Sequence, residues 1–194
     1  MPWTPRTTAP DVTIKYYRGV GYYVGVTDGV NECLVIDTNT GFVMPNCVGY
    51  SWGRWYEAFN VRPDLSRGDA YLWYAAAAGY YQRGNTPQVG AIACWYNVNH
   101  PNSGGHVAVV ESITGGIPTT SNSGYGGPLF WTEQLSYDTN TGDWLRGYYP
   151  SDYGWQGFIY PPSSGGGGFK LLPFTAGQRR FSNGRGRIIN NRRF

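Results

Sequence analysis

Cysteine and long apolar runs are both scarce in this chain of 194 residues. Its three cysteines are an odd number that leaves at least one thiol unpaired, so they do not build a disulfide framework. No stretch approaches the roughly 20 apolar residues of a transmembrane helix, and the start, MPWTPRTTAP, lacks the basic and apolar regions of a signal peptide. We therefore expect no membrane insertion and no signal peptide. An unpaired cysteine with a functional role becomes a hypothesis to examine.

Charged residues are also few, at 14 % of the chain, and acids are missing from one end. Residues 162–194 contain seven Lys or Arg and no Asp or Glu, which leaves 8 bases against 12 acids elsewhere. A basic segment suits an anionic partner or the acidic face of another subunit, but it can also be merely solvated. Charge alone does not distinguish an anionic partner, an acidic subunit face and a solvated segment. Nucleic acid is a possible but not a favoured partner.

Apolar residues make up 41 % of the chain and aromatic residues 17 %, enough to bury a core. Composition divides the chain into four parts. Residues 1–45 are expected to form an N-terminal arm or hairpins, and residues 46–161 the main folded domain. Residues 162–168 have the Gly/Ser composition of a flexible linker, and residues 169–194 form the basic tail.

Local patterns predict helices first and strands afterwards. Asn46 can cap a helix with an aromatic stripe that runs to Arg62-Pro63, and a second helix is expected over Gly68–Ala78, with Asp69 at its start. Strands are expected over the apolar runs Ala91–Tyr96, His106–Ile113, Ile117–Asn122, Pro128–Leu135 and Trp155–Tyr160. This order predicts an α+β domain with an antiparallel sheet.

Cys47 falls in the first turn of the predicted helix, where the helix dipole and unpaired amides stabilise a thiolate. Only two histidines could serve as its base, and His106 opens a strand whereas His100 lies in a polar loop. Asn122, on the adjacent predicted strand, could orient the ring of His106. We expect the Cys47 sulfur within about 4 Å of one ring nitrogen of His106, with Asn122 on the other. On spacing alone, a buried structural Cys47 is the more common outcome.

Four short segments, in order, resemble the successive blocks of the CHAP family of cysteine, histidine-dependent amidohydrolases/peptidases, in its phage form. They are Asn46–Arg54, Gly90–Trp95, Gly105–Glu111 and Ser121–Tyr125. The resemblance implies a papain-like (NlpC/P60-type) α+β fold, with N-terminal helices packed on an antiparallel sheet. It implies Cys47 as nucleophile, His106 as general base and acid, and Asn122 as orienter, acting on amide bonds of bacterial peptidoglycan.

Asn122 is where the chain departs from many relatives, which carry Glu in the equivalent place. A neutral amide can fix the ring tautomer of His106, but it supports an imidazolium less than a carboxylate does. The other nearby acid, Glu111, lies five positions along the strand and should point to the opposite face.

The implied chemistry needs no cofactor and no metal. Some family members bind calcium near the nucleophile, but Asp28, Glu32 and Asp37 are too far apart in sequence to form a tight calcium loop. We therefore expect no structural calcium.

Aromatic residues near the expected site are candidates to bind substrate, although each is equally able to fill the core. The candidates are Tyr50, Trp52, Trp95 and Tyr125. Cys94 is expected to be a buried, inert thiol, and Cys33 has no assigned role.

Three function classes follow from the resemblance: a phage lytic enzyme, a bacterial wall-remodelling enzyme or toxin, and an inactive structural protein of a virion tail. The expected absence of a signal peptide disfavours the second, and the joint presence of Cys47, His106 and Asn122 disfavours the third. Within the first, the lack of a long wall-binding domain favours a lysin carried in the virion tail over an endolysin released at host lysis. Residues 1–45 and 169–194 would then dock onto other phage tail proteins, and the protein would act from the virion or at the host cell wall.

Overall fold

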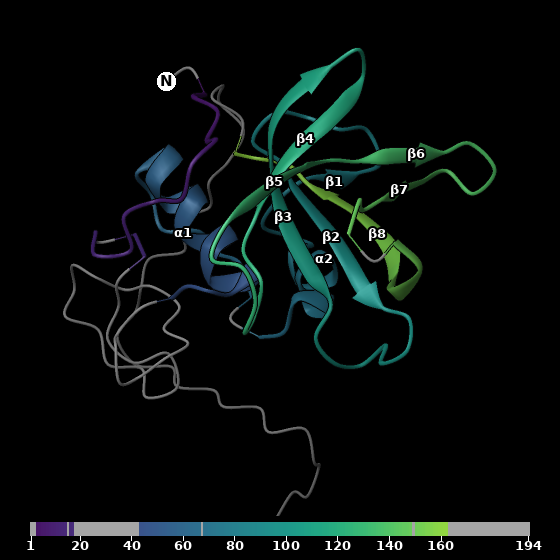
Figure 1. The fold of residues 1–194 in the computed structure, drawn as a ribbon, viewed down its shortest axis with the longest axis horizontal. Helices are drawn as coiled ribbons and strands as arrows, with labels where there is room; N and C mark the ends of the chain where they lie inside the picture. Colours follow the sequence, from purple (N-terminus) through teal and green to yellow (C-terminus); the bar gives the residue numbers. More distant parts are fainter. Residues whose placement is uncertain (1–2, 15, 18–42, 67, 149, 163–194) are drawn as a thin grey trace, which may run out of the picture. The chain divides into compact units, whose positions relative to one another are not determined.

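The computed structural model describes residues 3–14, 16–17, 43–66, 68–148 and 150–162, all within one compact unit, Met1–Ser164 (Figure 1). Its helical elements are α1 (Cys47–Phe59), η1 (Ala70–Leu72), α2 (Trp73–Ala76) and η2 (Pro150–Asp152). Its strands are β1 (Arg83–Gly84), β2 (Ile92–Asn97), β3 (His106–Thr114), β4 (Ile117–Asn122), β5 (Trp131–Gln134), β6 (Ser136–Asp138), β7 (Asp143–Leu145) and β8 (Tyr153–Ile159). Most of the expected arm, nearly all of the linker, and the basic tail lie outside the described residues.

Helix α1 begins where the sequence predicts and ends at Phe59, before the expected stop at Arg62-Pro63. The side-chain oxygen of Asn46 accepts hydrogen bonds from the backbone N–H groups of Val48 and Gly49, which satisfies two of the free amides of the first turn. At the other end Asn60 adopts a left-handed conformation, with φ 52°, and donates its N–H to Tyr56. The cap therefore sets Cys47 as the first residue of the helix.

The second helix is shorter than the predicted Gly68–Ala78. It consists of the single 3-10 turn η1 followed by the four-residue α2. Asp69 does not cap it through its side chain; its Oδ2 instead accepts the N–H of Gly104, at 3.2 Å, in the loop before β3. The expected role of Asp69 at the helix start is therefore wrong, because its carboxylate binds the loop that contains Gly104.

The strands form a six-stranded sheet in the order β1-β8-β2-β3-β4-β5, in which every pairing is antiparallel. Strand β4 matches its predicted range, whereas β5 starts three residues later than predicted. A separate hairpin, β6–β7, was not predicted; it projects from the sheet in Figure 1. The predicted α+β architecture, with helices packed on an antiparallel sheet, is confirmed.

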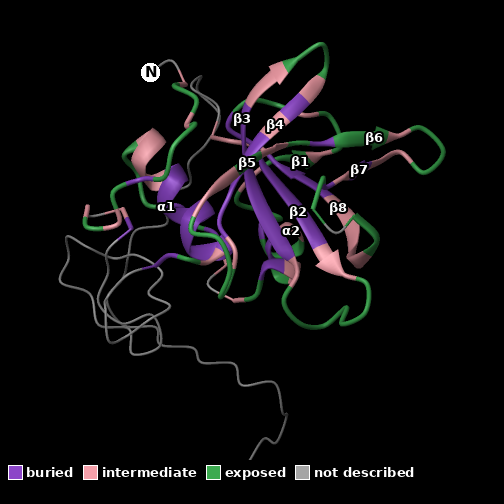
Figure 2. Cartoon of the chain, in the orientation of Figure 1, coloured by how far each residue is buried: buried purple, intermediate pink, exposed green. Residues whose placement is uncertain are grey.

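Both faces of the sheet are covered, since most of β3 is buried (Figure 2). Its side chains alternate between two cores. Val107 and Val109 pack with α1, η1 and α2 in one core, while Ala108 and Val110 pack with Leu135 and Trp144 in a second. Burying large apolar surface on each face contributes most of the stability of such a domain. The start of β3 therefore lies between two well-packed layers, and that is where His106 is located.

Candidate active site

Backbone N–H groups surround the sulfur of Cys47, which is buried at the start of α1. Burial raises the pKa of this thiol, because a thiolate is poorly solvated there. The N–H of Val107, the positive charge of Arg146, and the N–H groups of Val48 and Cys47 itself all act in the opposite direction. The helix start thus favours the thiolate locally, as expected, but burial outweighs it, and the resting group is a thiol.

His106 is buried at the start of β3, within a box of aromatic rings. The ring centroids of Trp95, Trp131 and Tyr153 lie 5.9–6.1 Å from that of His106. Burial and, second, the charge of Arg146 lower the pKa of His106 to about 3, against the opposing effect of its hydrogen bond to Asn122. The imidazole is therefore neutral near pH 7 and able to accept a proton.

Asn122 holds one ring nitrogen of His106, since its Oδ1 lies 2.9 Å from Nε2. The amide is fixed in this orientation because its Nδ2 donates to the carbonyl and the hydroxyl oxygen of Thr120, at 3.3 and 3.1 Å. An oxygen that only accepts requires Nε2 to carry the proton. The free lone pair is then on Nδ1, the tautomer that a base for a thiol needs.

Three contacts link the segments that carry these residues. The backbone N–H of Asn46 donates to Ser123 Oγ at 3.0 Å, which joins the start of α1 to the end of β4. The Cys47 sulfur meets the N–H of Val107, the residue after His106. The bond between His106 and Asn122 joins two of the predicted site residues directly, and Cys47 is linked to them through the neighbouring Val107 and Ser123.

The expected contact between the Cys47 sulfur and the His106 ring stays a prediction. Among the described residues, the sulfur is hydrogen-bonded to backbone amides, and no hydrogen bond joins it to the ring. His100 is no rival base, because it lies exposed in the loop before β3, where its N–H binds Asn97 Oδ1.

Three of the four aromatic candidates for substrate binding belong to the core. Tyr50 and Trp95 are 0 % exposed and Trp52 is 1 % exposed, so none of them can contact a bound ligand in this structure. Trp95 instead packs beneath His106, and its indole N–H donates to the carbonyl of Trp144. Tyr125, 79 % exposed just after β4, is the only one of the four that stays a candidate.

Arg146, which follows β7, is a member of the site that the sequence reasoning missed. It is buried, its Nε lies 3.4 Å from Glu133 Oε1, and its guanidinium carbon lies 4.5 Å from the ring centroid of Tyr153. No local pattern distinguishes this arginine in the sequence, because its role depends on the unpredicted hairpin β6–β7.

Glu111 lies on the opposite face of β3 from His106, as the alternation predicts, and it pairs with Arg54 on α1. The Cys94 thiol is fully buried and its pKa is raised well above its usual value by burial, in keeping with the inert role expected of it. Cys33 lies outside the described residues.

Neither a group of three or more potential metal ligands nor a helix fit to cross a membrane is found in the described part of the chain. The calcium candidates Asp28, Glu32 and Asp37 lie outside it.

Comparison with known protein families gives a match over part of the chain. Residues 36–124 match the CHAP domain, a segment that contains Cys47, His106 and Asn122. Residues 36–124 carry the CHAP domain. The match confirms the resemblance seen in the four sequence blocks of the CHAP domain, while its phage origin stays an expectation.

Among solved structures, the chain is similar to an N-acetylmuramoyl-L-alanine amidase from Staphylococcus aureus, with 24 % sequence identity and a TM-score of 0.39. The similarity covers 53 % of this chain and 30 % of that one, so it spans less than a third of the amidase. No curated protein matches the chain.

Proposed function

We propose that this CHAP protein hydrolyses an amide bond of bacterial peptidoglycan, with Cys47 as the nucleophile. The observation that carries the proposal is the hydrogen bond between His106 and Asn122, with the Cys47 thiol at a helix start on the backbone N–H of Val107, the residue after His106. That arrangement supplies a nucleophile, a neutral base in the correct tautomer, and a group that orients the base. The CHAP match adds the substrate class.

The reaction starts from a neutral Cys47 thiol and a neutral His106 imidazole. Nδ1 of His106 takes the thiol proton as the Cys47 sulfur attacks the carbonyl carbon, and the backbone N–H of Cys47 helps to hold the oxyanion. His106 then gives the proton to the leaving amine, and a thioester to Cys47 remains. Water, activated by His106, hydrolyses the thioester and regenerates the thiol. Asn122 keeps the ring in place through both proton transfers.

Digestion of purified cell walls tests the assignment, with the intact protein compared with Cys47→Ala and with Cys94→Ala. Cys94 is also a buried free thiol, on β2, and serves as the matched control. We expect the release of wall fragments to be lost in Cys47→Ala and retained in Cys94→Ala. Equal release by wild type and Cys47→Ala would refute the nucleophile.

The bond that is cut follows from the new termini, identified by mass spectrometry in the same digests. A free N-terminal L-alanine indicates an N-acetylmuramoyl-L-alanine amidase. A new terminus inside the stem or cross-bridge indicates an endopeptidase. The same three residues can serve both reactions, so the geometry does not choose between them.

We further propose that the protein acts from a phage virion, as a tail-associated lysin, and not as a free endolysin. The support is the basic composition of residues 169–194, which suits docking onto an acidic face of another tail protein. Antibody detection in purified phage particles, compared with the particle-free lysate, tests this. Presence only in the lysate would favour the endolysin.

A further inference from the structure

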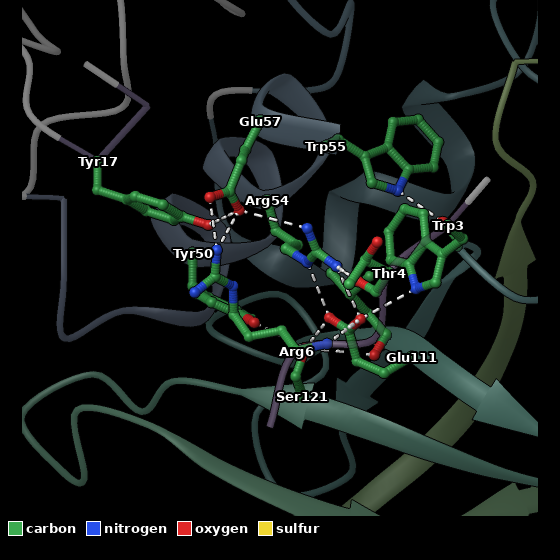
Figure 3. A network of polar contacts seen from close by, with 12 residues as sticks. Trp3, Thr4, Arg6, Tyr17, Tyr50, Arg54, Trp55, Glu57, Glu111 and Ser121 are labelled. Atoms are coloured by element: carbon green, nitrogen blue, oxygen red, sulfur yellow. Dashed lines mark hydrogen bonds and ion pairs between the residues drawn. The ribbon is translucent and has the colours of Figure 1, made fainter. Parts of the chain in front are cut away.

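A buried ion pair joins the helix that carries Cys47 to strand β3. Arg54 donates from Nε to Glu111 Oε1 and from Nη2 to Glu111 Oε2, both at 2.9 Å, and the two side chains are 6 % and 2 % exposed (Figure 3). Buried charges need complete hydrogen bonding, since each ion has lost its water. The other groups that hydrogen-bond to Arg54 and Glu111 therefore show which parts of the chain this buried ion pair connects.

An irregularity in the sheet places Glu111 in this network. The register between β3 and β4 shifts between Val110 and Ser112, so that Glu111 has no Cα partner on β4. Such bulges redirect a side chain and are frequent beside functional sites. Here the shift lies five residues along β3 from His106.

The N-terminal residues 3–6 complete one side of the network. Trp3 donates its indole N–H to Glu111 Oε2 at 3.0 Å, and the backbone N–H of Arg6 donates to the same oxygen at 2.9 Å. The carbonyl of Thr4 accepts from Arg54 Nη2 at 2.6 Å. The Arg54 guanidinium also lies 4.4 Å from the Trp3 ring centroid. A segment more than 40 positions before α1 in sequence thus binds both charges.

The other side of the network reaches the catalytic residues. Ser121 Oγ donates to Glu111 Oε1 at 2.7 Å, and the hydroxyl of Tyr50 donates to Ser121 Oγ at 2.7 Å. Ser121 directly precedes Asn122 on β4, and Tyr50 lies one helical turn after Cys47 on α1. The chain of bonds in Figure 3 therefore ends at Ser121 and Tyr50, which are close in sequence to Asn122 and Cys47.

We propose that Glu111 is a positioning residue of the catalytic centre, and that residues 3–6 complete it by fixing its carboxylate. The N-terminal segment then controls how α1 and β4 are held relative to each other, and through them how Cys47 and Asn122 are placed. The consequence for turnover rests on the proposed function. The positioning itself does not, because it can be measured on the Cys47 thiol.

Two substitutions in the full-length protein break the network at opposite ends. Ser121→Ala removes the hydroxyl between Glu111 and Tyr50. Trp3→Phe removes the indole N–H and keeps an aromatic ring over Arg54. The matched control is Trp73→Phe, which loses another indole hydrogen bond, to the carbonyl of Gly68 at 3.2 Å, outside this network.

Three quantities are measured at a temperature at which all variants are folded by circular dichroism: kcat, KM, and the rate at which iodoacetamide alkylates Cys47. We expect Ser121→Ala to lower kcat and the alkylation rate about tenfold, because small misplacements of reacting groups are costly, and to leave KM unchanged. Trp3→Phe should act in the same direction, and the double variant should be no worse than Ser121→Ala alone, since both break one chain of contacts. Trp73→Phe should change neither rate.

Wild-type kcat and alkylation in both network variants would overturn the proposal, as would equal losses in Trp73→Phe. Failure of the proposed function has a different signature. In that case Cys47→Ala still releases wall fragments, while the alkylation rate continues to report on the positioning of Cys47.

Discussion

Asn122 Oδ1 and His106 Nε2 lie 2.9 Å apart, and the amide that provides this oxygen is itself held by Thr120. The contact selects one ring tautomer and leaves Nδ1 free to accept a proton. It does so without adding a negative charge to a site where burial and Arg146 already disfavour the imidazolium. The centre is therefore arranged for a neutral thiol and a neutral imidazole.

Replacement of Asn122 should separate orientation from charge. Asn122→Ala removes the orienting oxygen, and we expect kcat to fall about 100-fold or more, because an unheld ring samples the wrong tautomer. Asn122→Asp keeps an acceptor and adds a charge that raises the pKa of His106, so the acid limb of the pH–rate profile should move to higher pH. Unchanged kcat in Asn122→Ala would remove Asn122 from the mechanism.

Arg146 should act on both partners of the site through its charge. The charge lowers the pKa of His106 and that of the Cys47 thiol, so Arg146→Gln should raise both. The His106 shift is measured by NMR titration of the ring, and the Cys47 shift by the pH dependence of alkylation.

Arg83→Gln is the matched control for Arg146→Gln. Arg83 also stacks on a tyrosine, with 4.6 Å from its guanidinium carbon to the Tyr74 ring centroid, but it is exposed on β1. It should leave both pKa values unchanged. Equal shifts in the two variants would show that the effect is not local to Arg146.

Local signals were sufficient to predict the parts of the site that short segments encode. Asn46 is a strong helix cap and Arg62-Pro63 a strong stop, so the start of α1, and with it the place of Cys47, could be read from the sequence. Alternation along β3 correctly placed Glu111 on the face opposite His106.

Long-range packing decided what the sequence could not show. Aromatic residues are common both in cores and in binding grooves. The sequence therefore could not predict that Tyr50, Trp52 and Trp95 are buried. The role of Arg146 depends on a hairpin whose short strands give a weak pattern. The docking of Trp3 onto Glu111 joins residues 108 positions apart, beyond the reach of any local periodicity.

Stability should fall in acid through His106. Its pKa is lowered from 6.5 to about 3 in the folded protein, so between these values the unfolded chain binds a proton that the folded chain does not. Stability from this group is therefore complete above about pH 6.5 and is lost as the pH falls toward 3. Denaturant unfolding from pH 7 to pH 4 should show a steeper loss for wild type than for His106→Gln. Parallel curves would contradict the lowered pKa.

The turn before His106 offers a paired test of how β3 is positioned. Gly104 and Gly105 both have positive φ, 65° and 81°, but their surroundings differ. A Cβ on Gly104 would meet no atom within 4 Å, whereas one on Gly105 would lie 2.6 Å from the carbonyl oxygen of Trp95 and 2.8 Å from the backbone nitrogen of Tyr71. An alanine at Gly104 therefore costs only the strain of a positive φ. An alanine at Gly105 has that strain and also clashes with the backbone of Trp95 and Tyr71.

We therefore expect Gly104→Ala to lower the free energy of unfolding by about 1 kcal/mol, the usual cost of a left-handed alanine. Gly105→Ala should cost about 3 kcal/mol or more, because the strain of overpacking is added. It should also reduce kcat, since the backbone that must yield is attached to His106 and to its neighbour Trp95. Urea denaturation and wall-digestion rates of the two variants, measured side by side, check this. Equal costs would mean that the loop before β3 relaxes freely and does not position His106.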